Sequence, residues 1–188
     1  MRFYKRLVTP EYNGASCLLK AIQIDDIESI RLWRNQQIPF LRQNHQISEL
    51  EQRQYFEEII WPQLNLDEPE CMIFSVFRAG ELVAYGGLVH ISWTDRRAEL
   101  SFLMNPKFTE TSDYRKTFVD FLEVMKKLAF DELKLHRLYT ETFSINQRNF
   151  EILESSGFTL EGTLTDHVYK AGYWYSSTIH GLISPITK

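Results

Sequence analysis

Two strand patterns separated by a long amphipathic helix constrain the fold of this chain more than any other feature. The stretch from Ala98 to Asn105 (AELSFLMN) alternates between two faces with the period of a β-strand. A helical pattern follows over roughly Tyr114 to Leu133, and a second strand pattern covers Arg137 to Phe143. Another helix start, bracketed by Ser144 and Gln147, comes directly after that strand. Helical crossovers therefore flank the second strand, which predicts a mixed sheet of the α/β or α+β class.

The other elements are predicted from the same periodicity and from their terminal residues. Further strand patterns occupy Ser16 to Ile24, Met72 to Phe77, Glu81 to Trp93, Thr159 to Tyr169 and Tyr173 to Ile183. Two helices separate the first two of these strands. The first helix is expected to be capped by Asp25, with Glu28 reaching back to it, and to end near Asn35. The second begins at the capping-box pair Ser48 and Glu51.

Apolar residues at helix and strand periods define the expected core. In the strand that begins at Ala98, one face carries Ala98, Leu100, Phe102 and Met104, and the other carries Glu99, Ser101 and Leu103. The helix residues expected to point inward are Ile27, Ile30, Trp33, Tyr55, Phe56, Ile59, Ile60, Phe118, Phe121, Leu122, Met125, Leu128, Ala129, Phe150 and Leu153. Pro62 is expected to stop the second helix, and Gly157 to end the last one. The order β-α-α-β-β-β-α-β-α-β-β fits a single domain over residues 1–188.

Charge and composition exclude several classes of protein. A net charge of −4 argues against a nucleic-acid partner, which would need a basic face. No run approaches the ~20 apolar residues of a membrane span, and the opening residues lack the apolar core of a secretory signal. The two cysteines, Cys17 and Cys71, fit a reducing compartment better than a disulfide scaffold. The histidines lack zinc-ligand spacing. We therefore expect a cytoplasmic protein with no membrane partner and no metal.

The second half of the chain resembles the GNAT N-acetyltransferases. The stretch LYTETFSINQRNFEILESSGFTLEG carries Asn146, Gly157-Phe158 and Glu161-Gly162 at the spacing of the branch that acetylates ribosomal-protein N-termini, spermidine and amino sugars. In the first half, IRLWRNQ, LRQNHQIS and YFEEII are similar to acceptor-side helices, and YGGLVHISW and RAELSFLMN to central strands. The resemblance covers roughly Leu18 to Ile183. It implies the single-domain GNAT fold, acetyl-CoA as co-substrate and a small-molecule amine as acceptor, and it allows a homodimer.

The resemblance also implies how acetyl-CoA is bound. In this family a bulge in the strand matching Glu99 to Asn105 separates it from the next strand, and backbone groups near Phe102, Leu103 and Met104 bind the pantetheine arm. Asn146 is expected to contact pantetheine, although the residue type also suits the first turn of a helix. Asn149 takes the position at which the ribosomal-protein branch has Ser. Leu153 takes the position of the usual general acid, a Tyr.

The turn before the long helix departs from the family pattern. GNAT proteins usually place a glycine-rich turn there, whose backbone amides bind the CoA pyrophosphate at a helix N-terminus. Here the segment from Pro106 to Lys116 contains no glycine, and Glu110 and Asp113 would repel phosphate. The residues expected to supply contacts instead are Thr111, Ser112, Arg115 and Lys116. Because of this departure, a GNAT-shaped binding or regulatory module without catalysis stays an alternative.

Two carboxylates and a phenol are the candidate catalytic groups. Glu99 lies where many GNAT proteins place a carboxylate that takes the proton of the amine directly or through water. As a strand residue it also suits a solvent-facing ion pair with Arg97. Glu141 is the second candidate base, with cross-strand pairing as its alternative role. Tyr139, or water, would protonate the leaving thiolate if an acid is needed.

Residues of the first helix and the loop after it are the candidate acceptor site. They are Trp33, Arg34, Asn35 and Arg42. Because Arg binds phosphate bidentately, these segments favour a nucleotide-linked amino sugar as acceptor. Packing of Trp33 in the core and solvation of Arg34 explain the same residues structurally. A polyamine or a protein N-terminus is the alternative acceptor, since an acidic pocket could form from Glu57, Glu58, Asp67, Glu68 and Glu70.

Overall fold

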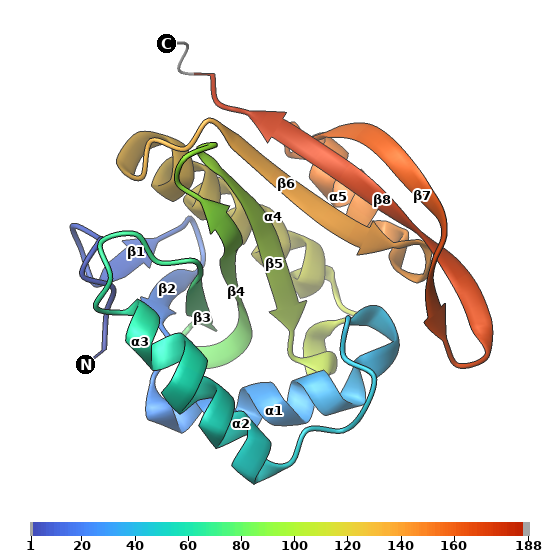
Figure 1. Cartoon of the computed structure of the whole chain (residues 1–188), viewed down its shortest axis with the longest axis horizontal. Helices are drawn as coiled ribbons and strands as arrows, with labels where there is room; N and C mark the ends of the chain where they lie inside the picture. The colour runs from blue at the N-terminus through green and yellow to red at the C-terminus, as the bar shows by residue number, and fades with distance from the viewer. Residues whose placement is uncertain (1, 186–188) are drawn as a thin grey trace.

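Eight strands form one mixed sheet in the computed structural model, which describes residues 2–185. Their order across the sheet is β1-β2-β3-β4-β5-β6-β8-β7 (Figure 1). The strands are β1 Glu11–Asn13, β2 Leu18–Ala21, β3 Met72–Arg78, β4 Glu81–Ser92, β5 Arg97–Met104, β6 Arg137–Phe143, β7 Thr159–Lys170 and β8 Tyr173–Ile183. The α-helices are α1 Ile27–Gln36, α2 Glu49–Tyr55, α3 Trp61–Gln63, α4 Ser112–Lys126 and α5 Arg148–Ser155. The predicted order of elements is confirmed, with β1 and several short helical turns added to it.

The crossover that the sequence indicates joins the one parallel pair of strands in residues 2–185. β5 and β6 run parallel, and the other neighbouring strands are antiparallel. α4 continues into a π-helical turn, Lys127–Glu132, before β6 begins. Figure 1 shows α4 behind the sheet, and α1 and α2 in front of it. The connection therefore returns over one face of the sheet, as a parallel pair requires.

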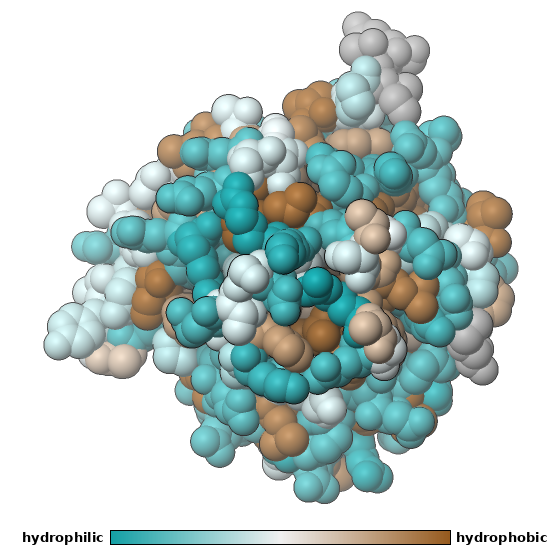
Figure 2. All heavy atoms as spheres, turned by 180° about the vertical axis from the view of Figure 1, so that it is seen from behind, coloured by the Kyte–Doolittle hydropathy of each residue, from teal (hydrophilic) through white to brown (hydrophobic). Residues whose placement is uncertain are grey.

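The two faces of the sheet bury separate apolar clusters. On the α4 side, the six helix residues predicted to point inward from Phe118 to Ala129 are all buried, together with Leu100 and Met104 of β5. On the α1 side, Ile27, Ile30 and Trp33 pack with Leu103. The alternation predicted for β5 therefore holds. Seen from behind, apolar residues form small groups among hydrophilic ones (Figure 2).

Helix termini account for most differences from the prediction. Asp25 does not cap α1; instead Asp26 accepts a hydrogen bond from the backbone N–H of Gln23 at 2.9 Å and from Ser75 at 2.6 Å. Ser144 lies inside a 3₁₀ turn, Ser144–Asn146, and makes no side-chain cap. The first predicted strand is shorter, because the chain turns into another 3₁₀ turn at Ile24–Asp26. In contrast, the capping box of Ser48 and Glu51 is present.

A π-helical turn changes which residues the second helix buries. Phe56–Ile60 forms this turn between α2 and α3, and α3 ends one residue beyond Pro62. Phe56 and Ile60 are buried as predicted, but Tyr55 is 50% exposed and Ile59 is 48% exposed. The wider turn rotates side chains away from a regular 3.6-residue stripe. Tyr55 and Ile59 consequently line a cavity rather than the core.

A buried carboxylate on α4 anchors the loop between β1 and β2. Asp120 accepts backbone hydrogen bonds of 2.7 to 2.8 Å from Ala15, Ser16 and Cys17. Burial alone would raise the pKa of Asp120, but these hydrogen bonds outweigh it and lower the pKa. The ion is therefore the form that the folded state stabilises.

We expect Asp120→Asn to lower the free energy of unfolding by about 1–3 kcal/mol at pH 7, because donors to a buried acceptor lose their charged partner. Folding lowers the pKa of Asp120. Its contribution to the free energy of unfolding is therefore present at pH values above the ordinary pKa of an Asp side chain, about 3.9, and is lost as the pH falls further. Urea unfolding of both proteins at pH 7 and pH 3 checks this, and the difference should shrink at pH 3. Equal stability at pH 7 would contradict the anchoring role.

Neither a membrane-spanning helix nor a metal site is found in the described part of the chain. No helix within residues 2–185 is long and apolar enough to cross a membrane. The same residues contain no group of three or more His, Cys, Asp or Glu side chains arranged to hold a metal ion.

Candidate active site

β5 and β6 pair over a short distance and then diverge. Their parallel register runs from Arg97↔Arg137 to Glu99↔Tyr139 and goes no further. Figure 1 shows the two strands separating beyond this point. The backbone edge of β5 after Glu99 is therefore open towards β6. Thr140, the next residue of β6, has a buried hydroxyl without a hydrogen-bond partner.

The expected bulge lies in the strand next to the one predicted. β5 keeps a continuous register with β4 from Glu99 to Met104. The register shift falls instead between Val89 and Ser92 of β4, and His90 there has a φ of +50°. The separation of β5 from β6, which the resemblance implied, is thus present. The extra residue of the bulge belongs to β4 and not to β5.

A cavity of about 620 Å³ passes through the gap between β5 and β6. Its walls come from both faces of the sheet. On one side lie Tyr55 and Ile59, with Tyr114 and Phe118 of α4 on the other. Because the opening connects the two faces of the sheet, two substrates can enter, one from each face, and meet at the gap between the strands.

Two predicted carboxylates and one predicted arginine meet in this cavity. One guanidinium nitrogen of Arg42, Nη2, lies 2.8 Å from Glu99 Oε1 and 2.6 Å from Glu141 Oε2. The side chains of Glu99 and Glu141 are 8% and 13% exposed, whereas half of Arg42 is exposed. Arg97 instead pairs with Asp95, so the expected ion pair of Glu99 with Arg97 is replaced by one with Arg42.

Two histidines flank the same carboxylates. His90 Nε2 is 3.8 Å from Glu99, and His167 Nε2 is 3.4 Å from Glu141. Burial alone would raise the pKa of Glu141, but the hydrogen bond and charge of Arg42 outweigh it and lower the pKa. Glu141 is therefore held as a carboxylate near neutral pH. The periodicity of the sequence could not reveal either histidine, since β4 and β7 are distant along the chain.

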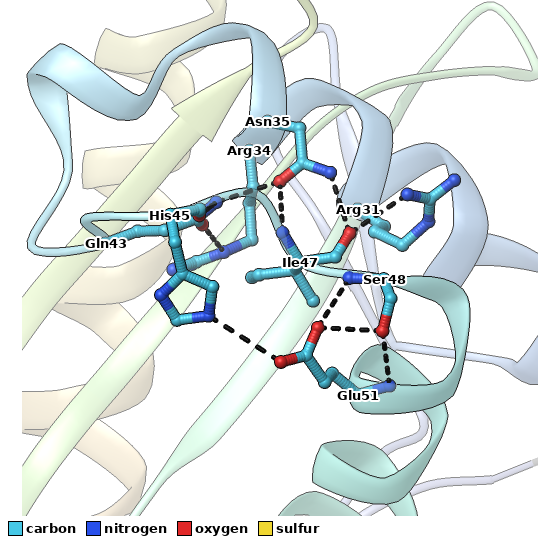
Figure 3. A network of polar contacts seen from close by, with 8 residues as sticks. All are labelled: Arg31, Arg34, Asn35, Gln43, His45, Ile47, Ser48 and Glu51. Carbon is cyan, nitrogen blue, oxygen red and sulfur yellow. Dashed lines mark hydrogen bonds and ion pairs between the residues drawn. The ribbon is translucent and has the colours of Figure 1, made fainter.

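A polar network holds the loop that carries Arg42 (Figure 3). Arg34 donates to the Gln43 side chain at 3.0 Å, and Gln43 donates to Asn35 at 2.8 Å. Asn35 also exchanges hydrogen bonds of 2.8 Å with the backbone of Ile47. From the β7–β8 hairpin, Lys170 donates to the Gln43 carbonyl at 2.8 Å. Asn35 is thus a structural residue that positions the loop.

The α4 side of the cavity presents a phenol that the sequence reasoning missed. The Tyr114 hydroxyl donates to Asn149 Oδ1 at 2.7 Å, and Asn146 lines the same wall. Burial raises the pKa of Tyr114, so the phenol stays protonated. Arg148 lies over its ring at 3.8 Å. The only signal in the sequence was the helical pattern, which does not show where the hydroxyl ends.

The segment before α4 uses many of its backbone amides internally. The residues whose N–H groups bond within residues 105–114 are Lys107, Phe108, Thr109, Thr111, Asp113 and Tyr114. Its two acids are paired with arginines, Asp113 with Arg78 at 3.0 Å and Glu110 with Arg148 at 3.3 Å. This local bonding leaves fewer amides for an anion than a glycine-rich turn does. Arg148, which lines the cavity, also donates to the Thr109 carbonyl, so an anion on this side would compete with these partners for its guanidinium group.

The structure brings together some of the predicted site residues and separates others. Those that line the cavity are Glu99, Glu141, Phe102, Leu103, Met104, Asn146, Asn149, Arg34 and Arg42. Those outside its lining are Tyr139, Thr111, Ser112, Arg115, Trp33 and Asn35.

Each residue outside the lining has another environment. Tyr139 lies against Arg137, Thr111 caps α4, and Ser112 opens that helix. Arg115 donates to Ser155 on α5 at 3.0 Å. Trp33 is buried in the core on the α1 side.

Comparison with solved structures identifies the fold. A spermidine N-acetyltransferase from Vibrio cholerae, solved in complex with CoA and spermine, superposes with a TM-score of 0.78 and 19% identity, covering 91% of this chain and 97% of that chain. A dodecameric structure of spermidine N-acetyltransferase from the same organism superposes with a TM-score of 0.72 and 19% identity, covering 90% of this chain and 95% of that chain. At this identity the likeness concerns the fold, and it confirms the predicted fold class.

Sequence comparison identifies the family. An uncharacterized N-acetyltransferase of Bacillus subtilis, YoaA, is 27% identical over 108 residues, which make up 56% of this chain. The match spans 57% of that protein's length. A family model for the acetyltransferase (GNAT) domain matches residues 19–179, nearly the whole sheet with its helices. The chain, with its strand gap and the cavity that passes through it, therefore belongs to the GNAT acetyltransferase family.

Proposed function

We propose that this protein transfers the acetyl group of acetyl-CoA to a primary amine of a small polyamine-like acceptor. The observation that carries the proposal is the cavity through the strand gap, with the carboxylates of Glu70, Glu99 and Glu141 in its lining. Acidic side chains suit a polycation. Both Vibrio cholerae structures are of spermidine N-acetyltransferase, which supports the same acceptor class.

The amino-sugar acceptor expected from the first helix has less support. That expectation relied on arginines free to bind phosphate. Arg34 donates to Gln43 at 3.0 Å and to the Tyr85 hydroxyl at 2.8 Å, and Arg42 bonds two carboxylates. Both guanidinium groups are thus engaged with neutral or acidic partners. None of the relatives described above is named for an amino sugar.

The acidic pocket takes a different form from the one predicted for a polyamine. Glu70 lines the cavity, but Asp67 pairs with Lys5 at 2.9 Å. Glu57, Glu58 and Glu68 are exposed outside the lining. The carboxylates of the proposed acceptor side are therefore mainly strand residues, and Arg34 and Arg42 line the same cavity.

The residues of the chain divide the chemistry between the two sides of the gap. Acetyl-CoA, when bound, supplies the thioester. The open backbone edge of β5, Asn146 and Arg148 would hold it on the α4 side. Glu99 accepts the proton of the acceptor ammonium, directly or through water, and Glu141 contributes negative charge beside it. Tyr114 takes the general-acid role expected of Tyr139, because its phenol lies in the cavity wall.

Replacing Tyr114 by Phe removes the proposed acid while keeping the ring. We expect kcat to fall by about 10²-fold, the lower end for general acid–base groups. Steady-state kinetics with saturating amine measures it. Tyr169→Phe, on the exposed β7–β8 hairpin, is the matched control and should leave kcat unchanged. A kcat for Tyr114→Phe within twofold of wild type would assign thiolate protonation to water or another group.

Calorimetry followed by an acceptor screen tests the proposed function. Acetyl-CoA and free CoA are titrated into the protein; micromolar binding is the expected result. Acetylation of spermidine, a nucleotide-linked amino sugar and an N-terminal peptide is then compared. Preference for spermidine supports the proposal, and preference for the sugar nucleotide restores the other acceptor. No CoA binding at millimolar concentration would contradict the proposed function and favour a non-catalytic module.

The homodimer stays a prediction, and the dodecamer of the Vibrio cholerae enzyme makes self-association worth measuring.

A further inference from the structure

Arg42 places one cationic nitrogen where two largely buried carboxylates converge. Its Nη2 atom is the partner of both Glu99 and Glu141, at 2.8 and 2.6 Å. A primary ammonium group is likewise one charged nitrogen with several N–H donors, and it would satisfy the same two oxygen atoms. The position of Nη2 in the cavity wall is therefore suited to an ammonium group. In this structure the side chain of Arg42 occupies it.

We infer that Arg42 occupies the position at which an ammonium group of the acceptor binds, and that the acceptor must displace it. This inference rests on the proposed function, because the competing ligand is the amine acceptor of that reaction. A monoamine that displaces Arg42 replaces one positive charge between the two carboxylates by another, so it gains little binding free energy. A polyamine brings further ammonium groups, for which Glu70 of the same cavity is a partner. Because displacing Arg42 costs both kinds of amine the same free energy, only an amine with such a further contact binds the wild-type site tightly.

The surroundings of Arg42 allow its side chain to leave without moving the backbone. The neighbouring residue Gln43 is fixed through its carbonyl to Lys170 at 2.8 Å and through its side chain to Arg34 at 3.0 Å. These anchors lie on the β7–β8 hairpin and α1, independent of the two carboxylates (Figure 3 shows the α1 part). Half of the Arg42 side chain already faces solvent. Its guanidinium can thus move into water while the loop stays in place.

The other charged groups around the site determine the conditions of a test. His90 and His167 face Glu99 and Glu141 at 3.8 and 3.4 Å, and each adds positive charge if protonated. The test therefore uses pH 8, because a high pH disfavours the protonated form of any imidazole. Low ionic strength preserves the interactions of partly exposed charges.

Binding of spermidine and n-butylamine to Arg42→Gln tests the inference. At pH 8 and without acetyl-CoA, calorimetry should show tighter binding of both amines than to wild type. We expect Kd to fall about fivefold for both amines, since partly exposed ion pairs are worth about 1 kcal/mol and each 1.4 kcal/mol is tenfold. Arg53→Gln, an exposed arginine of α2, makes the same change in net charge and should leave both Kd values unchanged.

Two further variants separate competition from a general effect on the cavity. Arg42→Lys keeps a single cation and should resemble wild type. Adding Glu141→Gln to Arg42→Gln should remove the gain in affinity. The inference would be overturned if Arg42→Gln melts at the temperature of wild type but binds the amines no more tightly than wild type does. It would also be overturned if neither amine bound to any variant. Because these titrations omit acetyl-CoA, failure of acetyl transfer would count against the proposed function alone.

Discussion

Glu99→Gln is expected to lower kcat/KM for the amine by about 10²–10⁴-fold, the range for loss of a positioned general base. Gln keeps the size and the hydrogen-bonding oxygen of the side chain, but it cannot accept the ammonium proton. The side chain is 8% exposed at the point where β5 leaves β6, so bulk water does not readily replace it. The effect should appear in kcat as well as in kcat/KM.

Matched measurements isolate the proton transfer from substrate binding. Calorimetry should give the same Kd for acetyl-CoA in Glu99→Gln and wild type, because the groups proposed to hold it lie on the α4 side of the gap. Glu57→Gln makes the same chemical change on an exposed residue outside the cavity lining and should retain full activity. A Glu99→Gln enzyme with more than a third of wild-type kcat/KM would move the base to Glu141 or to water.

Gly86→Ala should destabilise the protein by more than about 3 kcal/mol, the upper end for overpacking of a core. Gly86 of β4 pairs with Phe102 of β5. A Cβ atom there would lie 2.3 Å from the Ser101 carbonyl oxygen and 3.0 Å from Phe102 Cα, both backbone atoms. Since these cannot move without displacing β5, the strand that borders the cavity must shift.

Thermal unfolding measures this effect. For a chain of this size we expect the melting temperature to fall by roughly 6–12 °C, at about 2–4 °C per kcal/mol. Acetyl-CoA binding should weaken in the folded fraction, because the open edge of β5 moves. Gly162→Ala on β7, where an added Cβ meets nothing within 4 Å, is the control and should melt near wild type. A Gly86→Ala protein that melts within 2 °C of wild type would falsify the close-packing argument.

The elements of the fold were predictable because their signals are local. Helix and strand periods depend on residues a few positions apart, so the core of α4 and the two faces of β5 agree with the structure. The capping box at Ser48 works within one turn of the chain and was also predicted correctly. The short β1 strand was missed, because it forms only by pairing with β2.

Several residues that line the candidate site were named from the sequence, and the features that the sequence did not show share one cause. Glu99, Glu141 and Arg42 were each identified, but their meeting at one nitrogen depends on three segments distant in the sequence. Tyr114 was not named, because its position in the cavity wall depends on α4 packing beside Asn149 of α5. Tyr139 was named as the candidate acid, since the position of a residue in a strand pattern does not show whether its side chain reaches the cavity.

The sequence by itself determined the order of elements, most of the buried helix positions and the family, all of which rest on short-range periodicity and motif spacing. Only the tertiary structure decided where β5 and β6 separate, which carboxylates face one cation, and that Tyr55 and Ile59 leave the core at a π-helical turn. These are outcomes of packing between segments far apart in the chain. A local pattern carries no information about them until the strands and helices are assembled.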